Sequence, residues 1–154
     1  MEKLKLDADI YQLNALELAP KLLGMYLCRQ INGDIIKLKI TETEAYCGEK
    51  DTACHAHKGK TKRTKVMYEP GGLTYIYLCY GIHNLLNVVS GEKDDPQAVL
   101  IRGVEGFNGP GKLTKALKID RSLNAVDLTT SDLIWIESTD KIYEYDTTPR
   151  IGIA

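Results

Sequence analysis

A β-hairpin centred on Asn32-Gly33 constrains the fold of this chain more than any other feature of its sequence. Apolar and charged residues alternate along residues 35–40, which is the period of a half-buried strand, and a second apolar-rich run occupies residues 25–31. Asn-Gly suits a two-residue hairpin turn because both of its residues tolerate positive φ. The stretch therefore predicts two antiparallel strands, and any fold for the chain has to pair them.

The rest of the chain predicts short strands separated by turns, with few helices. Helices are expected over residues 15–24, which Asn14 can cap, and over 109–119. Pro20 fits poorly inside the first helix, so its regular turns are expected to begin near Ala19. Further strands are predicted at 73–80, 84–90, 98–105, 133–137 and 150–154. The pattern indicates one α+β domain, with a largely antiparallel β-sheet or partial barrel and a few short helices.

Charge is distributed unevenly along a chain whose net charge is only −1. That total excludes a protein that is basic throughout, as many nucleic-acid binders are. Residues 55–121 nevertheless carry a net charge of +5, and the segment 55–65 contains five basic residues and no acidic one. Such a segment is either a contact surface for a polyanion or a solvated loop, and charge alone favours neither. The five residues are Lys58, Lys60, Lys62, Arg63 and Lys65.

The N-terminus and the cysteines bear on the compartment. No apolar run approaches the ~20 residues of a membrane span, and the first residues lack the layout of a secretory signal. We therefore expect an intracellular protein without membrane contact, in the cytoplasm or nucleoid of a bacterium or the nucleus of a eukaryote. In that setting the four cysteines are expected to be free thiols. They are Cys28, Cys47, Cys54 and Cys79.

Charged residues interrupt the apolar pattern directly after the hairpin. If the alternation continues beyond Ile40, then Glu42, Glu44 and Tyr46 fall on the same strand face as Ile40, where a core is expected. A carboxylate in such a place is either paired with a cation or used in chemistry. A salt-bridged strand end, or a bulge that turns the glutamates to water, explains the pattern at least as well. The strand alone leaves the question open.

Tyrosines gather in the predicted strand 73–80. Tyr75 and Tyr77 share one face of that strand, whereas Tyr80 falls on the other face or in the turn before Gly81. Aromatic residues are common in strands for packing reasons alone. The functional alternative is a wall on which a nucleic-acid base stacks, with one ring protruding beyond it.

Two further motifs imitate known sites without completing them. Cys54, His55 and His57, with Cys47 before them, offer zinc donors, but their spacing matches no common structural zinc site, and no metal is expected. Residues 106–112 approach the pattern of a phosphate-binding loop. Leu113 stands where a Ser or Thr must hold the metal, so a nucleotide hydrolase is disfavoured.

The motifs taken together, in order, resemble one family. They are "ETEAY" at 42–46, His55, "PGGLTYIYLCYG" at 70–81, Asn87, "VLIRGVE" at 99–105 and "GPGKL" at 109–113. The chain resembles the alkyladenine (3-methyladenine) DNA glycosylases of the mammalian-type fold, from about Leu18 to the C-terminus. Each motif alone is weak, and the ordered set is specific. Chains of that family usually continue past the equivalent of Ala154, so a minimal or a truncated member is expected.

The resemblance implies a role for each of seven residues. Glu44 would be the general base that activates water against C1′ of the damaged nucleotide, with Arg102 beside it. Tyr80 would enter the duplex and fill the gap that the extruded base leaves. Asn87 would crowd the 2-amino group of guanine. The residues that line the pocket for the flipped base would be Tyr46, His55 and Tyr77.

The function that the resemblance implies is monofunctional base excision. The enzyme would flip alkylated or deaminated purines from damaged double-stranded DNA and hydrolyse the N-glycosidic bond, leaving an abasic site. The expected lesions are 3-methyladenine, hypoxanthine, 1,N6-ethenoadenine and 7-methylguanine. A monomer without cofactor, metal or lyase activity is expected, with the basic residues of 55–65 on the DNA backbone. The alternative is a non-catalytic nucleic-acid-binding module that uses the same segment and the tyrosines.

Overall fold

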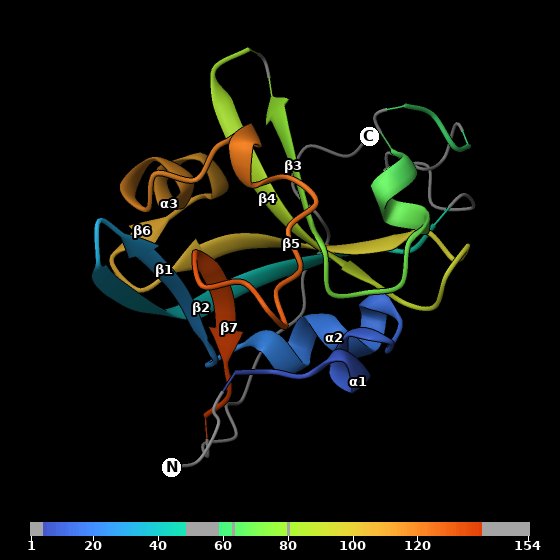
Figure 1. Ribbon diagram of the computed structural model, residues 1–154, viewed down its shortest axis with the longest axis horizontal. Helices are drawn as coiled ribbons and strands as arrows, with labels where there is room; N and C mark the ends of the chain where they lie inside the picture. Colours follow the sequence, from blue (N-terminus) through green and yellow to red (C-terminus); the bar gives the residue numbers. More distant parts are fainter. Residues whose placement is uncertain (1–4, 49–58, 63, 80, 140–154) are drawn as a thin grey trace.

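The hairpin predicted around Asn32-Gly33 is part of a curled antiparallel sheet in the computed structural model (Figure 1), which describes residues 5–48, 59–62, 64–79 and 81–139. The hairpin consists of β1 (Tyr26–Ile31) and β2 (Asp34–Tyr46), with Ile31 paired to Asp34. Asn32 and Gly33 have φ of 51° and 87°, as the two-residue turn requires. This prediction from the sequence is confirmed.

The strands within the described residues form one sheet in the order β3-β4-β5-β2-β1-β7, and β6 pairs with β5. All of these pairs are antiparallel. The further strands are β3 (Thr74–Cys79), β4 (His83–Ser90), β5 (Gln97–Val104), β6 (Phe107–Asn108) and β7 (Ile134–Glu137). The sheet curls because the long β2 pairs with β1 through its first half and with β5 through its second half (Figure 1). The predicted α+β fold with a largely antiparallel, partly closed sheet is confirmed, and the predicted strand 150–154 lies outside the described residues.

Helices are few and short, as the sequence predicted. They are α1 (Ala8–Tyr11), α2 (Ala15–Leu22) and α3 (Pro110–Ala116), with 3-10 turns η2 (Lys65–Tyr68) and η3 (Arg121–Leu123). Asn14 caps α2 by accepting a hydrogen bond from the Glu17 N–H at 2.9 Å. The expectation that regular turns begin near Ala19 is wrong, because the capped helix begins at Ala15 and includes Pro20. Burial of Leu18 and Leu22 on one side of α2 holds the helix despite the proline.

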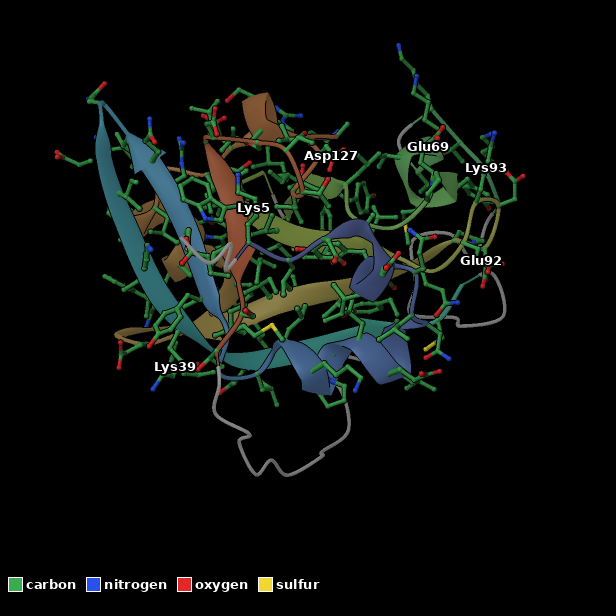
Figure 2. All side chains as sticks on the ribbon, turned by 60° about the horizontal axis from the view of Figure 1, so that its bottom comes forward. Lys5, Lys39, Glu69, Glu92, Lys93 and Asp127 are labelled. Carbon is green, nitrogen blue, oxygen red and sulfur yellow. The ribbon has the colours of Figure 1, made fainter. Side chains whose placement is uncertain are left out.

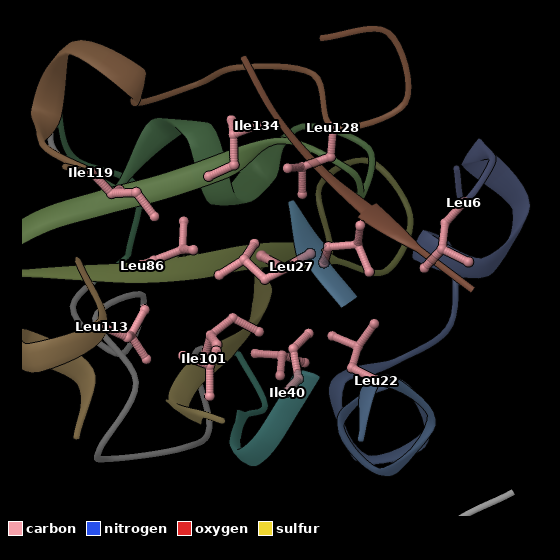
Figure 3. Close-up of a cluster of buried hydrophobic side chains, with 14 of the residues drawn as sticks. Leu6, Leu22, Leu27, Ile40, Leu86, Ile101, Leu113, Ile119, Leu128 and Ile134 are labelled. Carbon is pink, nitrogen blue, oxygen red and sulfur yellow. The ribbon is translucent and has the colours of Figure 1, made fainter. Parts of the chain in front are cut away.

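One face of the sheet carries the main hydrophobic core (Figure 3). Leu22 from α2 and Leu113 from α3 pack there with sheet residues such as Ile40, Leu86 and Ile101, and each of these is at most 1% exposed. Full burial of such a side chain is worth about 1.5–3 kcal/mol, so this cluster dominates the stability of the fold.

The opposite face of β3, β4, β5 and the second half of β2 carries a second, smaller cluster. Val66, Met67 and Tyr68 of η2 cover it and pack with Tyr75, Val89 and Ala98. The turn between β4 and β5 joins this cover, since the Asp94 N–H donates to the Tyr68 carbonyl at 2.7 Å. Figure 2 shows Glu92 and Lys93 of that turn on the same side of the molecule as Glu69, directly after η2. We call the face of β3, β4, β5 and the second half of β2 that carries this smaller cluster the site face, because the candidate residues lie on it.

Candidate active site

An irregularity in the pairing of β2 with β5 decides which way the glutamates point. Ile40 pairs with Val104, Glu42 pairs with Gly103, and Thr43 pairs with Ile101. Thr41 is therefore an extra residue on β2, and Arg102 is an extra residue on β5. Because each strand has one extra residue, the register of β2 with β5 is the same before and after the bulges. Beyond the bulges, however, the alternation of each strand is shifted by one residue, so that positions expected to face the core face the opposite side of the sheet.

Glycine at position 103 allows the two strands to approach closely at this point. A Cβ there would lie 3.1 Å from the Thr41 Oγ1 and 3.5 Å from the Glu42 Cβ. The first distance is tighter than ordinary van der Waals contact, so a larger residue at position 103 would require the Thr41 side chain to shift by a few tenths of an ångström. Gly103 is thus part of what fixes the local geometry of β2.

The expectation that Glu42, Glu44 and Tyr46 share a face with Ile40 is wrong because of these bulges. Beyond them it is Thr43 that faces the core, where its Oγ1 donates to the Ala19 carbonyl of α2 at 2.9 Å. Glu44 and Tyr46 point to the site face. Glu42 is exposed, in agreement with the alternative that a bulge turns a glutamate towards water.

Glu44 is the centre of a charged cluster on the site face. Its side chain is only 8% exposed. Arg102 donates from Nη1 to Oε1 of Glu44 at 2.9 Å, and the Tyr46 hydroxyl donates to Oε2 at 2.7 Å. Each carboxylate oxygen keeps a further lone pair that can accept from a water or a ligand. The two donors hold the carboxylate in one orientation without using all of its acceptor capacity.

Arg102 also reaches the second glutamate of the motif. Its Nε lies 3.4 Å from Oε2 of Glu42, whose side chain is 55% exposed. The Arg102 side chain is itself only 23% exposed, and its carbonyl accepts from the Gly109 N–H at 3.0 Å, immediately before α3. The guanidinium therefore lies between a buried and an exposed carboxylate.

A row of residues in register runs from Glu44 across the sheet. Glu44 pairs with Leu100, Leu100 with Asn87, and Asn87 with Tyr75. Residues directly opposite each other on neighbouring strands point to the same face, and the strands lie about 4.8 Å apart. Asn87 is thus about 10 Å from Glu44 in backbone terms. It is 3% exposed and donates from Nδ2 to the Tyr75 carbonyl at 3.2 Å.

The tyrosines predicted to form a wall lie along the same face. The rings of Tyr75 and Tyr77 have centroids 5.5 Å apart and are tilted by 38°. Tyr46 and Tyr77 pack against the smaller cluster beneath η2 while remaining partly exposed. The prediction that Tyr75 and Tyr77 share a face is confirmed, and the structure adds Tyr46 from β2 to the same side.

Tyr80, the residue expected to enter DNA, falls in the sequence between β3 and β4. Tyr80 lies outside the described residues, but its neighbours do not: Gly81 has φ of 66°, and the Ile82 side chain is 73% exposed. Helix α3 supports the base of this tip, since the Thr114 Oγ1 donates to the Asn84 carbonyl at 2.7 Å. An exposed apolar side chain thus stands two positions after Tyr80 on a braced hairpin.

The basic segment is described only in part, because His55, Lys58 and Arg63 lie outside the described residues. Lys60, Lys62 and Lys65 are exposed. Thr61 and Thr64 fix the backbone between them by reciprocal hydrogen bonds, in which each N–H donates to the other's Oγ1 at 2.9 and 3.1 Å. Lys60 Nζ lies 5.6 Å from the centroid of the Tyr68 ring. The Lys60 ammonium group therefore stands at the edge of the site face, beside Tyr68 of η2.

Two residues of the site went unnoticed in the sequence. Leu100 looks like ordinary strand filling, and only the register shows that it lies between Glu44 and Asn87. Ile82 looks like one more apolar residue after a glycine, and only its exposure sets it apart. A hydrophobic residue in the turn of a predicted hairpin is the sequence feature that could have pointed to the second.

Other expectations can be checked in the described part of the chain alone. Cys28 and Cys79 form no disulfide there, as expected, and Cys54 lies outside it. No group of three metal-binding side chains lies together among these residues. No helix among them is long and apolar enough to cross a membrane.

Comparison with known proteins identifies the family. The sequence profile of the methylpurine-DNA glycosylase (MPG) family matches residues 9–108 and 105–154. The chain belongs to this family, which confirms the resemblance found in the sequence. It is therefore a DNA glycosylase of DNA repair, a hydrolase that acts on N-glycosyl bonds, and DNA is its substrate. The family assignment favours this enzyme over a non-catalytic nucleic-acid-binding module.

Relatives from several bacteria carry the same name, "Putative 3-methyladenine DNA glycosylase". The chain is 39% identical to the protein of Natranaerobius thermophilus over 97% of its own length and 88% of the relative's. It is 42% identical to the protein of Psychrobacter cryohalolentis, over 88% and 78% of the two chains. It is 44% identical to the protein of Borreliella burgdorferi, over 86% and 77%. The similarity thus extends over most of each chain.

Proposed function

We propose that the protein removes 3-methyladenine and related purine lesions from double-stranded DNA by simple hydrolysis, with Glu44 as the general base. The observation that carries this proposal is the buried carboxylate of Glu44, held by Arg102 on one oxygen and by Tyr46 on the other. The names of the relatives supply 3-methyladenine as the lesion.

The chemistry requires a group that both stabilises positive charge and accepts a proton. Cleavage of an N-glycosidic bond passes through an oxocarbenium-like state at the sugar, and an anionic carboxylate close to C1′ stabilises it. The same carboxylate takes a proton from the attacking water, a contribution of about 10²–10⁴-fold in rate. Alkylation at N3 or N7 gives the base a positive charge, which makes it a better leaving group.

The aromatic residues of the site face supply the binding side of the proposal. A base inside a duplex has to be extruded before its sugar is accessible, at a cost of a few kcal/mol. Tyr46 and Tyr77, together with His55, would line the pocket for the extruded base, and stacking of a cationic base on these rings is favourable by about 0.5–2 kcal/mol. Asn87, two strands away from Glu44, would crowd the 2-amino group of guanine.

The surroundings of this face supply the contacts to the rest of the duplex. Tyr80 would fill the gap left by the extruded base, and the exposed Ile82 supports insertion of the hairpin tip, because an apolar side chain there gains from contact with stacked bases. The basic residues of 55–65 would contact phosphates as a group. We further propose that the enzyme acts as a monomer, without a metal and without cutting the strand.

A base-release assay tests this function directly. Oligonucleotide duplexes, each with one lesion, are incubated with the protein, and the free base and the abasic strand are quantified. We expect release of 3-methyladenine and also of hypoxanthine, ethenoadenine and 7-methylguanine. Strand breaks are expected only after alkaline treatment. Absence of any base release would contradict the proposed function, and strand breaks without alkali would contradict simple hydrolysis.

A further inference from the structure

We propose that Glu42 is a positioning residue for the glycosylase reaction, which acts by holding the guanidinium of Arg102 in the orientation that serves Glu44. The inference rests on the catalytic role proposed above for Glu44. Its basis is a chain of contacts: Oε2 of Glu42 lies 3.4 Å from Nε of Arg102, and Nη1 of Arg102 lies 2.9 Å from Oε1 of Glu44.

The bulges make this arrangement possible. Arg102 is the extra residue of β5 and has no register partner of its own. Its neighbours on β2 in the pairing are Glu42, opposite Gly103, and Thr43, opposite Ile101. Thr43 points to the core, and among the described residues the carboxylates that pair with Arg102 are Glu42 on one side and Glu44 on the other.

Contact at two atoms constrains a guanidinium more than contact at one. The group is planar and rigid, so a partner at Nε and a second at Nη1 together fix its plane. With Nη1 alone held, the guanidinium can still turn about that single contact, so its plane is not fixed. Glu42 therefore limits the conformations of the residue that orients the general base.

Loss of Glu42 is not expected to change the folding stability of the protein. Glu42 is 55% exposed, and ion pairs with such exposure contribute little to folding. A carboxylate on a DNA-binding surface also repels phosphates, so its presence weakens binding to a polyanion. The property in which we expect the loss of Glu42 to appear is therefore the rate of the chemical step, through its contact with Arg102.

The test measures three properties of Glu42→Gln, with Glu105→Gln as the matched control. Glu105 is exposed in the turn after β5, so the control removes the same charge without touching Arg102. Single-turnover release of methylated purines is measured on duplex DNA treated with dimethyl sulfate. Affinity is measured on a duplex with a tetrahydrofuran abasic analogue, and thermal stability by differential scanning calorimetry.

We expect Glu42→Gln to slow the single-turnover rate by about tenfold, the middle of the range for coupled residues of one ion-pair network. The thermal midpoint of Glu42→Gln should equal that of Glu105→Gln, and its affinity for DNA should be no lower. In an Arg102→Lys background, which lacks the Nε contact, Glu42→Gln should cost nothing further. Glu42→Asp, which keeps the charge, should be slowed less than Glu42→Gln.

Two outcomes overturn the inference. One is a rate for Glu42→Gln equal to that of Glu105→Gln. The other is an equal loss with and without Arg102, which would mean that Glu42 acts by another route. Glu44→Gln, measured in parallel, separates this failure from that of the proposed function: if Glu44→Gln is inactive while Glu42→Gln is normal, only the role of Glu42 is wrong.

Discussion

Arg102 and Glu44 meet on the site face through Nη1 and Oε1 at 2.9 Å, although 57 residues separate them in the chain. The contact exists because the register of β2 and β5 brings Arg102 opposite the acidic motif at the point where both strands bulge. Arg102 is fixed in turn by its carbonyl, which accepts from Gly109 at the start of α3. The general base proposed here is thus oriented by a residue that belongs to a different strand.

Removal of the Tyr46 hydroxyl should slow the reaction without weakening DNA binding. Tyr46→Phe removes the donor to Oε2 of Glu44 and keeps the aromatic face. A hydrogen bond to a charged group is worth about 1.5–3 kcal/mol, so we expect a slower single-turnover rate by about tenfold to a hundredfold. Affinity for abasic-analogue DNA should be unchanged. Tyr26→Phe, on β1, is the control, and an equal effect of both changes would contradict the assigned contact.

The proposed wedge should matter only where there is a duplex to open. Tyr80→Ser removes the ring expected to replace the extruded base in the stack, and a single strand offers no such gap. We expect a large loss of base release on duplex DNA and a smaller loss on the same lesion in a single strand. Equal losses on both substrates would exclude the wedge role.

The angle of the β3–β4 hairpin should depend on the absence of a side chain at Gly111. A Cβ there would lie 2.7 Å from Nδ1 and 3.1 Å from Cβ of His83 at the start of β4. Gly111→Ala should therefore displace the exposed His83 side chain, destabilise the protein by no more than about 0.5 kcal/mol and lower duplex excision. The double variant with His83→Ala removes the clash and should restore both properties. Failure of the second change to rescue the first would show that the contact does not set the hairpin.

Glu137 should make stability depend on pH. Burial opposes its ionisation, but hydrogen bonds from the Trp135 indole at 2.8 Å and from Lys37 at 2.9 Å outweigh burial and lower the pKa of the Glu137 carboxyl. A lowered pKa stabilises the folded state above the unfolded pKa of glutamate, and this contribution is lost as pH falls through the folded value. Wild type should exceed Glu137→Gln in unfolding free energy at pH 7, and the difference should be smaller at pH 3. Urea titrations at both pH values measure this, and a constant difference would contradict the assignment.

Cys28 should be inert in the folded protein. Burial, followed by the nearby Glu137 carboxylate, raises the pKa of the Cys28 thiol to about 12. Because the thiolate is the reactive form, iodoacetamide at pH 8 should leave Cys28 unmodified until denaturant unfolds the chain. Mass spectrometry of peptides before and after unfolding measures this, and rapid labelling of the native protein would contradict the burial of this thiol.

Local patterns predicted much of the fold because the features concerned are local. The Asn32-Gly33 turn and the Asn14 cap depend on residues that are adjacent in the chain, and both occur as predicted. The faces of β2 beyond Ile40 could not be predicted from alternation. They depend on bulges that form where β2 pairs with Gly103 and its neighbours on β5, which follow some 60 residues later.

The candidate site, too, combines features that the sequence predicted with features that depend on the pairing of distant strands. The resemblance predicted which residues belong to it, but only the register shows that Glu44, Leu100, Asn87 and Tyr75 form one row across four strands. Strand pairing between distant segments is set by packing of the whole sheet, which no short window of sequence contains. Glu42, left without a role by the resemblance, becomes interpretable once its contact with Arg102 is known.

Glu44→Gln tests whether Glu44 performs the chemistry. The change keeps the shape of the side chain and removes its ability to take a proton. We expect a loss of at least about a hundredfold in single-turnover release of 3-methyladenine, with affinity for abasic-analogue DNA retained. Glu69→Gln, an exposed glutamate of the turn before β3, serves as the control and should be normal. Release by Glu44→Gln at the wild-type rate would contradict the account.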